Sequence, residues 1–367
     1  MVRLVILGAT GSIGTTCLEA LRSCSFPVKV VGVSADRNRE KLERISEEYG
    51  CPFLLSEGDI AHSGLGEFLE KTRCDIVLNA IAGFDGLYAT KTVLEMGIDL
   101  ALANKESVVA GSCFIFRLAA QTGARIIPVD SEHSAIYNLL KNRKATKLVI
   151  TASGGPFVDR EDLSTVTKEE ALVHPTWKMG EKITVDSATL ANKGLEVIEA
   201  SCLFGFRGED IEVVVHRQSV VHSLIRTSDG AVYAQLSPPD MALAIMSAIG
   251  DGRFETENIV RPLSFSALNL TFEEPKREKF PLLGYAYRAL STGAAGGIIY
   301  NASDETAVRA FLSGGIRFDE IEKVVGLLLD DETLTEKHPS DYDDVLELDR
   351  AVRDRASVLI REKPWRG

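Results

Sequence analysis

Residues 2–14, Val-Arg-Leu-Val-Ile-Leu-Gly-Ala-Thr-Gly-Ser-Ile-Gly, place an apolar run directly before a glycine-rich turn. The run Val2–Leu7 predicts a buried strand, and the helix-like segment Ile13–Ser23 follows the turn. Glycines in such a turn let backbone N–H groups approach a pyrophosphate, whose charge the helix N-terminus favours. The strand–turn–helix context favours dinucleotide binding over a purely structural turn.

The same alternation of strand and helix patterns continues to about residue 150. Glycines just past three of the helical segments, at Gly50, Gly97 and Gly123, are typical C-cap positions. Strict βαβ alternation predicts a parallel, doubly wound, Rossmann-like sheet. The further strands are Val28–Val33, Cys51–Leu55, Asp75–Ile81, Asp99–Ala103, Ala124–Val129 and Lys147–Thr151, and the further helices are Asn38–Tyr49, Ile60–Lys71, Leu87–Met96, Ser107–Gln121 and Ser134–Lys141.

Composition narrows the class of protein. A chain of 367 residues predicts two or three domains, each with its own core. The net charge of −12 disfavours nucleic-acid binding, and no apolar run approaches the ~20 residues of a membrane span. The chain enters a strand at once, so we expect no leader peptide. Six scattered cysteines without a C-x-x-C pair predict reduced thiols and a cytoplasmic location.

The stretch 126–137, Ile-Ile-Pro-Val-Asp-Ser-Glu-His-Ser-Ala-Ile-Tyr, combines a strand pattern with two carboxylates. Asp130 and Glu132 are two residues apart, so in extended chain they leave one face of the strand end. Paired carboxylates at that edge suit Mg²⁺ or Mn²⁺. The alternative is that Asp130 or Ser131 simply caps a helix opening at His133.

Two other strand ends carry charges whose roles the sequence leaves open. After the second strand, Asp36 would suit the ribose hydroxyl of NAD, whereas Arg37 would suit the additional phosphate of NADP. After the fifth strand, Lys105 and Glu106 form either a solvated surface pair or, for Lys105, a group that polarises a substrate oxygen.

Tyr137 and Lys141 have the Tyr-x-x-x-Lys spacing of short-chain dehydrogenases. In those enzymes the tyrosine is a general acid on a long helix. Here Ile136, Leu139 and Leu140 surround Tyr137 at helical spacing, which favours a core or interface tyrosine.

Beyond residue 150 the alternation stops, and two loops carry polar groups. Ser153 lies in a glycine-rich turn after a strand, where its hydroxyl can bond an anion. The loop His174-Pro-Thr-Trp-Lys-Met-Gly180 resembles lids that exclude water, although a surface loop with Trp177 packed on the core is the alternative.

The segment 185–200 predicts a helix capped by Asp186 or Ser187. Its polar arc is either a solvent-exposed face or a phosphate site near a helix start, and in the second case the Glu196 carboxylate is available to a metal. Gly194 inside the helix serves close packing or substrate approach. The arc consists of Thr189, Asn192, Lys193 and Glu196.

The remaining segments predict strands and then helices. Ile211–Val215, Val220–Arg226 and Ala231–Leu236 look like antiparallel strands, and Ser237–Met241 looks like a stiff turn or a second lid element. Residues 271–282 read as a linker. The segments Tyr285–Leu290, Glu305–Ser313, Phe318–Asp330 and Tyr342–Arg361 predict a small helical bundle.

Taken together, these motifs resemble the 1-deoxy-D-xylulose 5-phosphate reductoisomerase family over most of the chain. They are GATGSIG, ANKES, PVDSEHSAI, SGGPF, HPTWKMG, VDSATLANKGLE, SPPDM and Asn301-Ala-Ser-Asp-Glu305. The resemblance implies a homodimer with an NADPH-binding Rossmann-like domain (1–150), an α+β connecting and catalytic domain (151–270), a linker (271–282) and a C-terminal helical bundle (283–367).

The resemblance also implies roles for individual residues. Asp130, Glu132 and Glu196 would bind Mg²⁺, Mn²⁺ or Co²⁺ and, with Lys105, act in catalysis. The ketose phosphate substrate would contact Lys105, Ser131, Glu132, Ser153, His174, Ser187, Asn192, Lys193 and Glu196, with Trp177 and Met179 covering it. NADPH would meet Gly8, Thr10, Gly11, Ser12, Ile13, Arg37, Asn38, Asn104, Glu106 and Gly180.

The implied reaction is the rearrangement and NADPH-dependent reduction of 1-deoxy-D-xylulose 5-phosphate to 2-C-methyl-D-erythritol 4-phosphate, in isoprenoid precursor biosynthesis. The sequence departs from the family at Arg217, where a proline is usual, which predicts a less rigid turn. It departs also at Asp36, whose charge would repel a 2′-phosphate. The alternatives are a metal-free short-chain dehydrogenase or epimerase using Tyr137 and Lys141, and a non-catalytic NADP-binding sensor.

Overall fold

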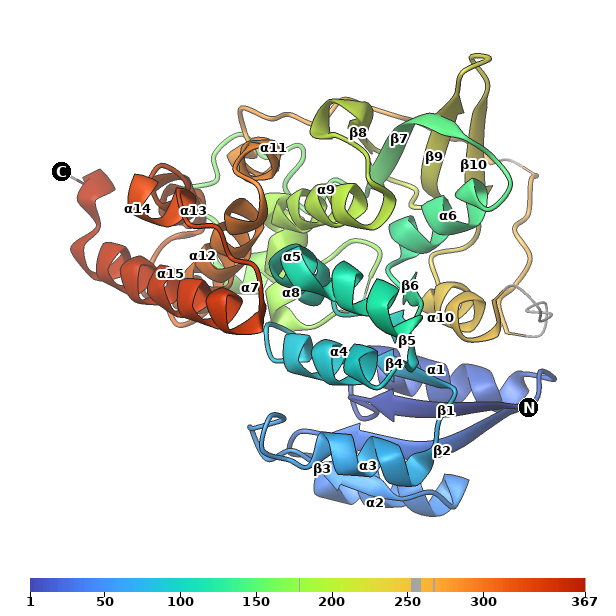
Figure 1. Cartoon of the computed structure of the whole chain (residues 1–367). Coiled ribbons are helices and arrows are strands. Elements are labelled where there is room, and N and C mark those ends of the chain that lie inside the picture. The colour runs from blue at the N-terminus through green and yellow to red at the C-terminus, as the bar shows by residue number, and fades with distance from the viewer. Residues whose placement is uncertain (178, 252–258, 267, 367) are drawn as a thin grey trace. The chain divides into compact units, whose positions relative to one another are not determined.

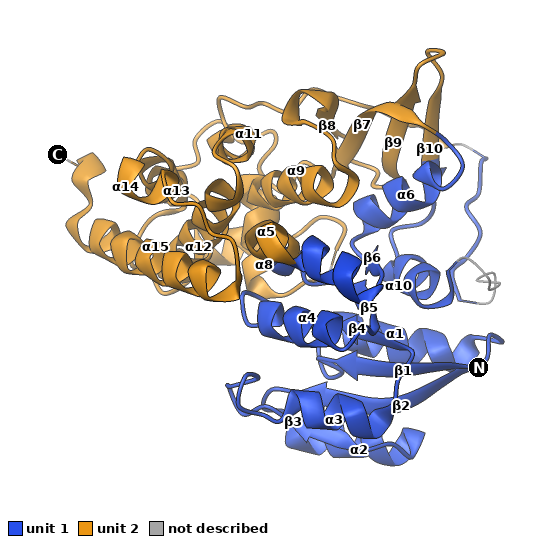
Figure 2. Ribbon diagram, in the orientation of Figure 1, with its two compact units in different colours: residues 1–107, 115–143, 235–266 blue, residues 108–114, 144–234, 267–367 orange. Residues whose placement is uncertain are grey.

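The computed structural model describes residues 1–177, 179–251, 259–266 and 268–366 (Figure 1). The chain forms two compact units, each made of discontinuous segments (Figure 2). Unit 1 comprises residues 1–107, 115–143 and 235–266, and unit 2 comprises residues 108–114, 144–234 and 267–367. The predicted division at residues 150, 270 and 282 differs from these units and stays a prediction of functional domains.

Unit 1 is built on a six-stranded parallel sheet in the order β3-β2-β1-β4-β5-β6. Its strand order reverses beside β1, where doubly wound sheets bind ligands beyond the strands' carboxyl ends. The predicted Rossmann-like sheet is therefore confirmed. The strands are β1 (Val2–Leu7), β2 (Val28–Ala35), β3 (Phe53–Leu55), β4 (Ile76–Asn79), β5 (Asp99–Leu102) and β6 (Ile126–Pro128).

The helices that connect the strands of the parallel sheet end at or next to the glycines that the sequence predicts as C-caps. Gly50 and Gly123 adopt the left-handed conformation at the C-caps of α2 and α5, and Gly97 does so just after α4. A side chain at such a φ is strained, so glycine ends these helices at low cost. The helices are α1 (Ser12–Ser23), α2 (Arg39–Tyr49), α3 (Leu65–Thr72), α4 (Gly86–Glu95), α5 (Lys105–Thr122) and α6 (Ser131–Leu140).

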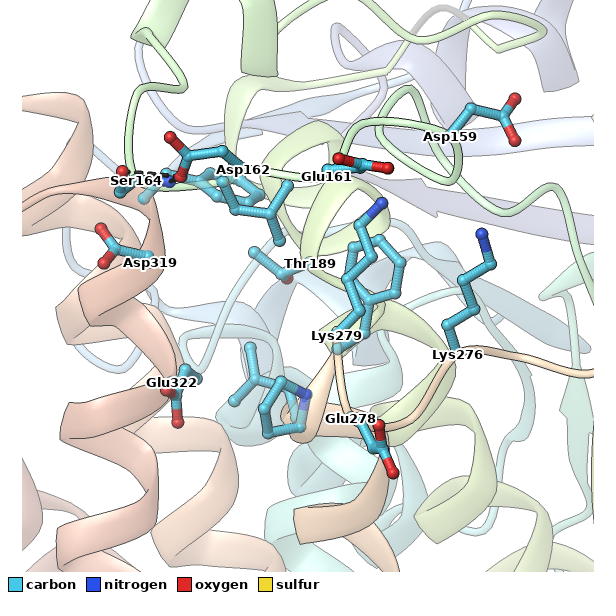
Figure 3. A pocket seen from close by; sticks show the side chains of 15 residues that line it. Asp159, Glu161, Asp162, Ser164, Thr189, Lys276, Glu278, Lys279, Asp319 and Glu322 are labelled. Carbon is cyan, nitrogen blue, oxygen red and sulfur yellow. Dashed lines mark hydrogen bonds between the residues drawn. The ribbon is translucent and has the colours of Figure 1, made fainter.

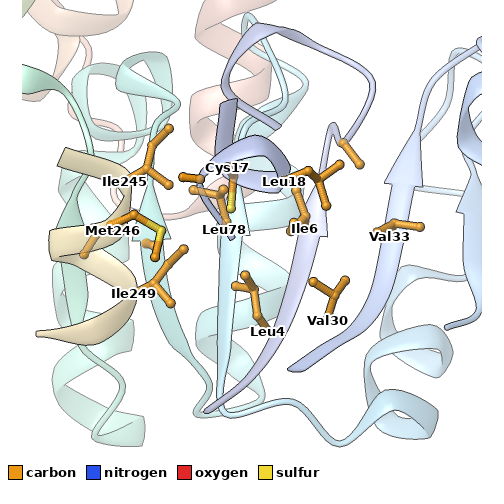
Figure 4. Packing of buried hydrophobic residues seen from close by; sticks show 14 of the residues in the cluster. Leu4, Ile6, Cys17, Leu18, Val30, Val33, Leu78, Ile245, Met246 and Ile249 are labelled. Atoms are coloured by element: carbon orange, nitrogen blue, oxygen red, sulfur yellow. The ribbon is translucent and has the colours of Figure 1, made fainter. Parts of the chain in front are cut away.

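Helix α10 (Met241–Gly250) completes the core of unit 1, although the sequence analysis did not predict it. Its Ile245, Met246 and Ile249 belong to one buried cluster with residues of β1, β2, β4 and α1, including Leu4 and Leu78 (Figure 4). The Asp240 carboxylate caps the helix by accepting from the Ala242 N–H at 2.8 Å. The sequence feature that predicts this helix is an N-cap residue directly before an almost continuous apolar run.

Unit 2 contains a four-stranded sheet in the order β10-β9-β7-β8. Two strand predictions are wrong. β7 (Ala145–Ala152), expected in the parallel sheet, lies here, and β8 (Ile211–Val215) pairs with it in parallel rather than antiparallel fashion. The long helical connection between the two strands permits a parallel crossover. β9 (Val221–Thr227) pairs with β7 in antiparallel fashion, and β10 (Val232–Leu236) lies beside β9.

The other part of unit 2 is helical, as the prediction of a C-terminal bundle requires. Helix α12 packs against α8, α9, α11, α13 and α15, and its Tyr300 is fully buried. None of the helices in the described ranges is long and apolar enough to cross a membrane. The helices are α7 (Lys168–Ala171), α8 (Glu181–Thr189), α9 (Ala191–Phe204), α11 (Pro281–Ser291), α12 (Ala294–Leu312), α13 (Ile321–Leu329), α14 (Glu332–Thr335) and α15 (Tyr342–Glu362), with 3-10 turns at Gly208–Asp210, Phe318–Glu320 and Pro364–Arg366.

The turn after β8 is held by side chains where the sequence predicted a looser one. The Arg217 guanidinium lies 2.6 Å from a carboxylate oxygen of Asp159 and 3.0 Å from one of Glu273. His216 is buried, its Nδ1 lies 2.9 Å from the Thr271 carbonyl oxygen, and its ring stacks on Phe272. Arg217 therefore anchors this turn by ion pairs.

A methyl group at Gly194 is expected to destabilise unit 2. A Cβ there would lie 2.2 Å from Oη of the buried Tyr300, which itself donates to the Leu282 carbonyl oxygen at 3.1 Å. The sequence left close packing and substrate approach open for Gly194, and the structure shows close packing. We expect Gly194→Ala to lower the free energy of unfolding by about 1–3 kcal/mol, the usual cost of overpacking. Thermal or urea unfolding measures it.

The matched control is Gly284→Ala. Gly284 lies in α11, and a Cβ there would meet nothing within 4 Å. Alanine is the better helix former, so this change is expected to be neutral or to stabilise by up to about 1 kcal/mol. Equal effects of the two substitutions would contradict the packing explanation.

Candidate active site

The glycine-rich turn between β1 and α1 leaves no room for a side chain at two positions. A Cβ on Gly8 would lie 2.6 Å from the carbonyl oxygen of Ala80, and a Cβ on Gly14 would lie 2.5 Å from the carbonyl oxygen of Gly8. Gly11 and Ser12 are exposed at the start of α1, and no side chain caps that end. The first-turn N–H groups of α1 are therefore open to an anion, which suits a cofactor pyrophosphate.

Lys41 adds a positive charge at this turn that the sequence analysis missed. Its Nζ donates to the Thr10 carbonyl oxygen at 2.9 Å and lies 3.1 Å from Thr15 Oγ1. Asn38 caps α2, accepting from the Lys41 N–H at 3.1 Å, so the side chain of Asn38 already has a structural task. The sequence feature that could have revealed this charge is a lysine three residues after the helix cap that follows the second strand. Thr10 and Ile13 are half-buried.

The charge of Asp36 is partly offset within the protein. One Asp36 oxygen accepts from the Gly58 N–H at 2.5 Å, and the other lies 3.2 Å from Arg37 Nε. The Arg37 side chain is 82% exposed and can reorient toward a ligand. The predicted repulsion between Asp36 and a 2′-phosphate is thereby reduced, because two donors already face the carboxylate.

Asn104 organises the loop beyond β5. It is buried, its Oδ1 accepts from the Ser107 N–H at 2.9 Å, and its Nδ2 donates to the carbonyl oxygens of Ile81 and Gly83, each at 2.8 Å. Nδ2 also lies 3.0 Å from a carboxylate oxygen of Glu106. These bonds use the whole amide, so Asn104 positions the loop against which the predicted cofactor would lie.

A buried ion pair occupies the carboxyl edge of β5 and β6. Lys105 Nζ lies 2.7 Å from Asp130 Oδ2, and the two side chains are only 7% and 12% exposed. Asp130 Oδ1 accepts from the Glu132 N–H at 3.3 Å and so caps α6. The capping prediction is therefore confirmed, and the second oxygen faces the Lys105 ammonium. The role of Asp130 as a metal ligand stays a prediction. Lys105 is not a solvated surface residue.

The position of Glu132 differs from the prediction of an extended strand end. β6 stops at Pro128, and α6 begins at Ser131, because the Asp130 cap starts the helix two residues earlier than expected. Glu132 therefore lies in the first helical turn, where Ser131 Oγ donates to its carboxylate at 2.6 Å. A negative charge in the first turn of a helix interacts favourably with the helix dipole.

Tyr137 and Lys141 do not form a dehydrogenase pair. Lys141 Nζ lies 5.1 Å from the centre of the Tyr137 ring, over its face, and 3.0 Å from a carboxylate oxygen of Asp251. The Tyr137 ring packs against the core of unit 1. The prediction of a packed tyrosine is confirmed.

In unit 2, His174 joins the SGGPF turn to α8. Its Nε2 lies 3.1 Å from Ser153 Oγ and 3.0 Å from Ser187 Oγ, and its Nδ1 accepts from the N–H groups of Thr176 and Trp177 at 3.0 and 2.9 Å. With Nδ1 accepting two bonds, the neutral ring carries its proton on Nε2. Three predicted substrate-binding side chains thus converge on one point.

The charge state of His174 follows from its surroundings. Burial, and then the positive charge of Lys193, lower the pKa of His174 to about 4. The ring is therefore neutral at physiological pH, and its Nε2–H serves as a hydrogen-bond donor without a charge. The positive charge at this place comes from Lys193.

Glu196 is the most deeply buried of the predicted ligands, with 1% of its surface exposed. Lys193 Nζ lies 2.6 Å from its Oε2, and Asn192 Nδ2 donates to its Oε1 at 2.6 Å. All three residues lie in the first two turns of α9, whose N-terminus favours anions. The predicted polar arc is thus largely buried and is not a solvent-exposed face, and its role in binding phosphate and metal stays a prediction.

The predicted single helix over 185–200 is in fact two helices. Leu190, at φ 60°, separates α8 from α9, and Asp186 and Ser187 lie inside α8 instead of capping a helix. A leucine in the left-handed region costs of order 1 kcal/mol, and such strain concentrates at functional sites. The break creates a second helix N-terminus directly before Asn192 and Lys193. Nothing in the residue types signals it.

The predicted lid lies between α7 and α8. Trp177 and Met179 are half-buried, and Gly180 is the N-cap of α8 with open space around its Cα. Lys178, between them, lies outside the described residues. The role of this loop as a lid stays a prediction.

A cavity of about 680 Å³ lies on unit 2, beside α8, the 276–282 segment and the turn before α13 (Figure 3). Its cations, Lys276 and Lys279, both donate to the Val158 carbonyl oxygen, at 3.4 and 3.0 Å. Its buried Thr189 hydroxyl donates to the Asp186 carbonyl oxygen. Its principal polar groups are therefore engaged within the protein, and of the residues of the predicted polar arc only Thr189 lines it.

Three family models match the chain. The model for 1-deoxy-D-xylulose 5-phosphate reductoisomerase matches residues 4–59 and 56–112, the model for its C-terminal domain matches residues 126–204, and a DXP reductoisomerase C-terminal domain model matches residues 236–355.

Curated relatives and solved structures agree with these matches. The chain is 41% identical to the 1-deoxy-D-xylulose 5-phosphate reductoisomerase of Treponema denticola, over 98% of each chain, and 43% identical to that of Mycobacterium marinum, over 98% of this chain and 93% of the other. It resembles a crystal structure of DOX-P reductoisomerase in complex with NADPH, fosmidomycin and magnesium, with a TM-score of 0.92, 33% identity and 98% coverage of both chains. It also resembles the Zymomonas mobilis enzyme in complex with NADPH, with a TM-score of 0.84, 33% identity and 98% coverage of both.

Proposed function

Because the chain belongs to the 1-deoxy-D-xylulose 5-phosphate reductoisomerase family, we propose that it converts 1-deoxy-D-xylulose 5-phosphate and NADPH to 2-C-methyl-D-erythritol 4-phosphate in isoprenoid precursor biosynthesis. The observation that carries the proposal is the match to curated reductoisomerases over nearly the whole length of both chains. The site residues predicted from the sequence are all present in the described structure, in the surroundings given above.

The proposed metal ligands are Asp130, Glu132 and Glu196. All three offer carboxylate oxygens, the donors that hard divalent cations such as Mg²⁺, Mn²⁺ and Co²⁺ accept, and all are at least partly buried. When bound, the cation supplies a Lewis acid for the ketone and hydroxyl oxygens of the substrate, and NADPH supplies the reducing equivalents. Lys105, held by Asp130, places a further positive charge where negative charge develops on those oxygens.

The proposed phosphate site uses groups from three segments of unit 2. Ser153, Ser187 and the Nε2–H of His174 supply neutral donors, while Lys193 supplies the charge and Asn192 an amide at the α9 N-terminus. A dianionic phosphate needs this mixture, because one cation and a helix dipole offset the charge and the hydroxyls complete the hydrogen bonds. Ser131 would contact the substrate backbone, and Trp177 and Met179 would exclude water from above it.

The proposed NADPH site follows the turn geometry. The crowded positions Gly8 and Gly14 leave backbone N–H groups at the surface for the pyrophosphate, next to Thr10, Gly11, Ser12 and Ile13. Arg37 and Lys41 are the cations available to the adenosine phosphate, Asn104 and Glu106 line the next strand end, and Gly180 precedes α8.

We further propose a homodimer in the cytoplasm. The dimer rests on the family resemblance, and the cytoplasm on the six cysteines, which form no disulfide. Light scattering at low micromolar protein concentration tests the dimer, and a single-chain mass there would reject it.

The test of the activity is NADPH oxidation with 1-deoxy-D-xylulose 5-phosphate, followed by absorbance, with Mg²⁺ and with EDTA. We expect turnover that requires the metal and that Mn²⁺ or Co²⁺ restores. Metal-independent turnover would reject the metal mechanism. NADPH binding without turnover under any condition would instead indicate a cofactor-binding sensor.

Tyr137→Phe is expected to leave this activity close to wild type. The Tyr137 ring packs against the core of unit 1 and its neighbour Lys141 pairs with Asp251, so we expect the hydroxyl to have no catalytic task. Steady-state kcat and KM measure the outcome, with Tyr49→Phe, another half-buried tyrosine of unit 1, as the matched control. A loss of turnover specific to Tyr137→Phe would revive the short-chain dehydrogenase mechanism.

A further inference from the structure

A buried charge cluster joins α8 to α12 within unit 2. Lys182 Nζ lies 2.6 Å from Asp186 Oδ2, one turn along α8, and 3.2 Å from Asp304 Oδ2 of α12. The Asp186 and Asp304 side chains are 1% and 0% exposed. None of the proposed metal, phosphate or cofactor contacts uses these three residues.

The hydrogen bonding of Asp304 indicates that it is not a carboxylate. Lys182 Nζ faces Asp304 Oδ2 at 3.2 Å, but within the described residues neither carboxyl oxygen of Asp304 accepts a hydrogen bond of good geometry, although both oxygens are buried. The carboxyl of Asp186 lies within hydrogen-bonding reach of Asp304, and a bond between two carboxyl groups needs a proton on one of them. Lys182 lies closer to Asp186, so Asp186 is the ion and Asp304 the acid.

Electrostatics favours the same assignment. Burying a carboxylate without a full complement of partners costs several kcal/mol, whereas a protonated acid avoids that cost. Burial raises the pKa of Asp304 and the charge of Glu305 raises it further, and together they outweigh Lys182 and the hydrogen bond with Asp186, which lower it. The remaining titratable neighbour, Tyr300, is neutral, because burial raises its pKa well above the usual value. Glu305 is itself paired with Arg353 at 2.5 Å.

We propose that Lys182, Asp186 and a protonated Asp304 form a neutral clamp that positions Ser187 for the substrate phosphate. Successive residues of a helix point about 100° apart, so fixing Asp186 against α12 fixes the direction of Ser187. Ser187 Oγ in turn lies 3.0 Å from His174 Nε2. The positioning role rests on the proposed function, whereas the protonation of Asp304 does not.

The first test is the pH dependence of thermal unfolding for wild type and Asp304→Asn. A pKa raised above the ordinary value of 3.8 gives stability that is fully present below that pH and is lost as the pH rises through the folded-state pKa. The amide of asparagine donates to Asp186 at every pH. We therefore expect the Tm difference between Asp304→Asn and wild type to shift in favour of Asp304→Asn as the pH rises from mildly acidic to alkaline.

Asp343→Asn is the control, because Asp343 is exposed in the first turn of α15. A Tm of Asp304→Asn that is lowered equally at acidic and alkaline pH would overturn the protonated clamp. This measurement needs no substrate, so it stands even if the proposed function fails.

The second test separates positioning from folding. Lys182→Met is expected to raise KM for the ketose phosphate about tenfold, equivalent to one lost hydrogen bond to a charged group, and to leave the Kd of NADPH unchanged. Lys182→Arg, which keeps the charge, is expected to restore KM. Unchanged KM in a folded Lys182→Met protein would overturn the positioning role, and absence of turnover in wild type would instead reject the proposed function.

Discussion

Glu196→Gln is expected to lower kcat/KM about a thousandfold or more and to abolish the metal dependence of what remains. The substitution removes a proposed metal ligand, and metal charge stabilisation is worth several kcal/mol. It also removes the partner of Lys193, 2.6 Å away and 7% exposed, so a buried ammonium is left without its carboxylate. Measurement combines NADPH oxidation over a Mg²⁺ titration with the Kd of NADPH.

The Kd of NADPH distinguishes a chemical effect from misfolding, because the proposed cofactor contacts other than Gly180 lie in unit 1 and Glu196 lies in unit 2. Glu212→Gln is the matched control: Glu212 is a partly exposed carboxylate of the same unit, paired with Arg226, and such pairs contribute about 1 kcal/mol or less. Wild-type metal dependence in Glu196→Gln would remove Glu196 from the ligand set and leave Asp130 and Glu132 to explain the cation.

Gly14→Ala is expected to weaken NADPH binding about a hundredfold. The new Cβ would lie 2.5 Å from the Gly8 carbonyl oxygen and 2.6 Å from Ala9 Cα, and backbone atoms cannot swing aside as a flexible side chain does. The turn must therefore open, which costs about 1–3 kcal/mol and displaces the N–H groups aimed at the pyrophosphate. Fluorescence titration gives the Kd, and thermal unfolding gives the change in stability.

Gly66→Ala provides the comparison for Gly14→Ala. Gly66 lies in α3 of the same unit, and a Cβ there meets nothing within 4 Å. We expect unchanged cofactor affinity in this control. If Gly14→Ala binds NADPH as well as Gly66→Ala does, the phosphate-turn assignment is wrong.

The parallel sheet was predictable because its evidence is local. Apolar runs and the glycine caps lie within each element, and β1 matches its predicted bounds. The errors arose where partners are distant in sequence. β7 carries no mark that separates it from the preceding strands, yet its neighbours are β8 and β9. Helix α10 was missed because its apolar residues fill a core formed by residues 4–129, more than a hundred residues earlier in the chain.

The site was predictable in its residue types and less so in its geometry. Carboxylates, serines and lysines in the two acidic motifs indicated metal and phosphate chemistry. The start of α6 at Ser131 and the break at Leu190 were not predictable. Each depends on the conformation and hydrogen bonds that the backbone adopts among its neighbours, which residue types alone do not show. The low pKa of His174 follows from burial, which a sequence does not show.

The late return of the chain to unit 1 has a consequence for synthesis on the ribosome. The strands β1 to β6 emerge first, but the surface that α10 covers stays open until residues 241–250 leave the exit tunnel, after much of unit 2 has been made. A nascent chain paused before that point lacks the α10 side chains that pack on α1, α6 and β5, and we expect its open apolar surface to recruit chaperones. Expression of the first 143 residues alone would trap the protein in that state.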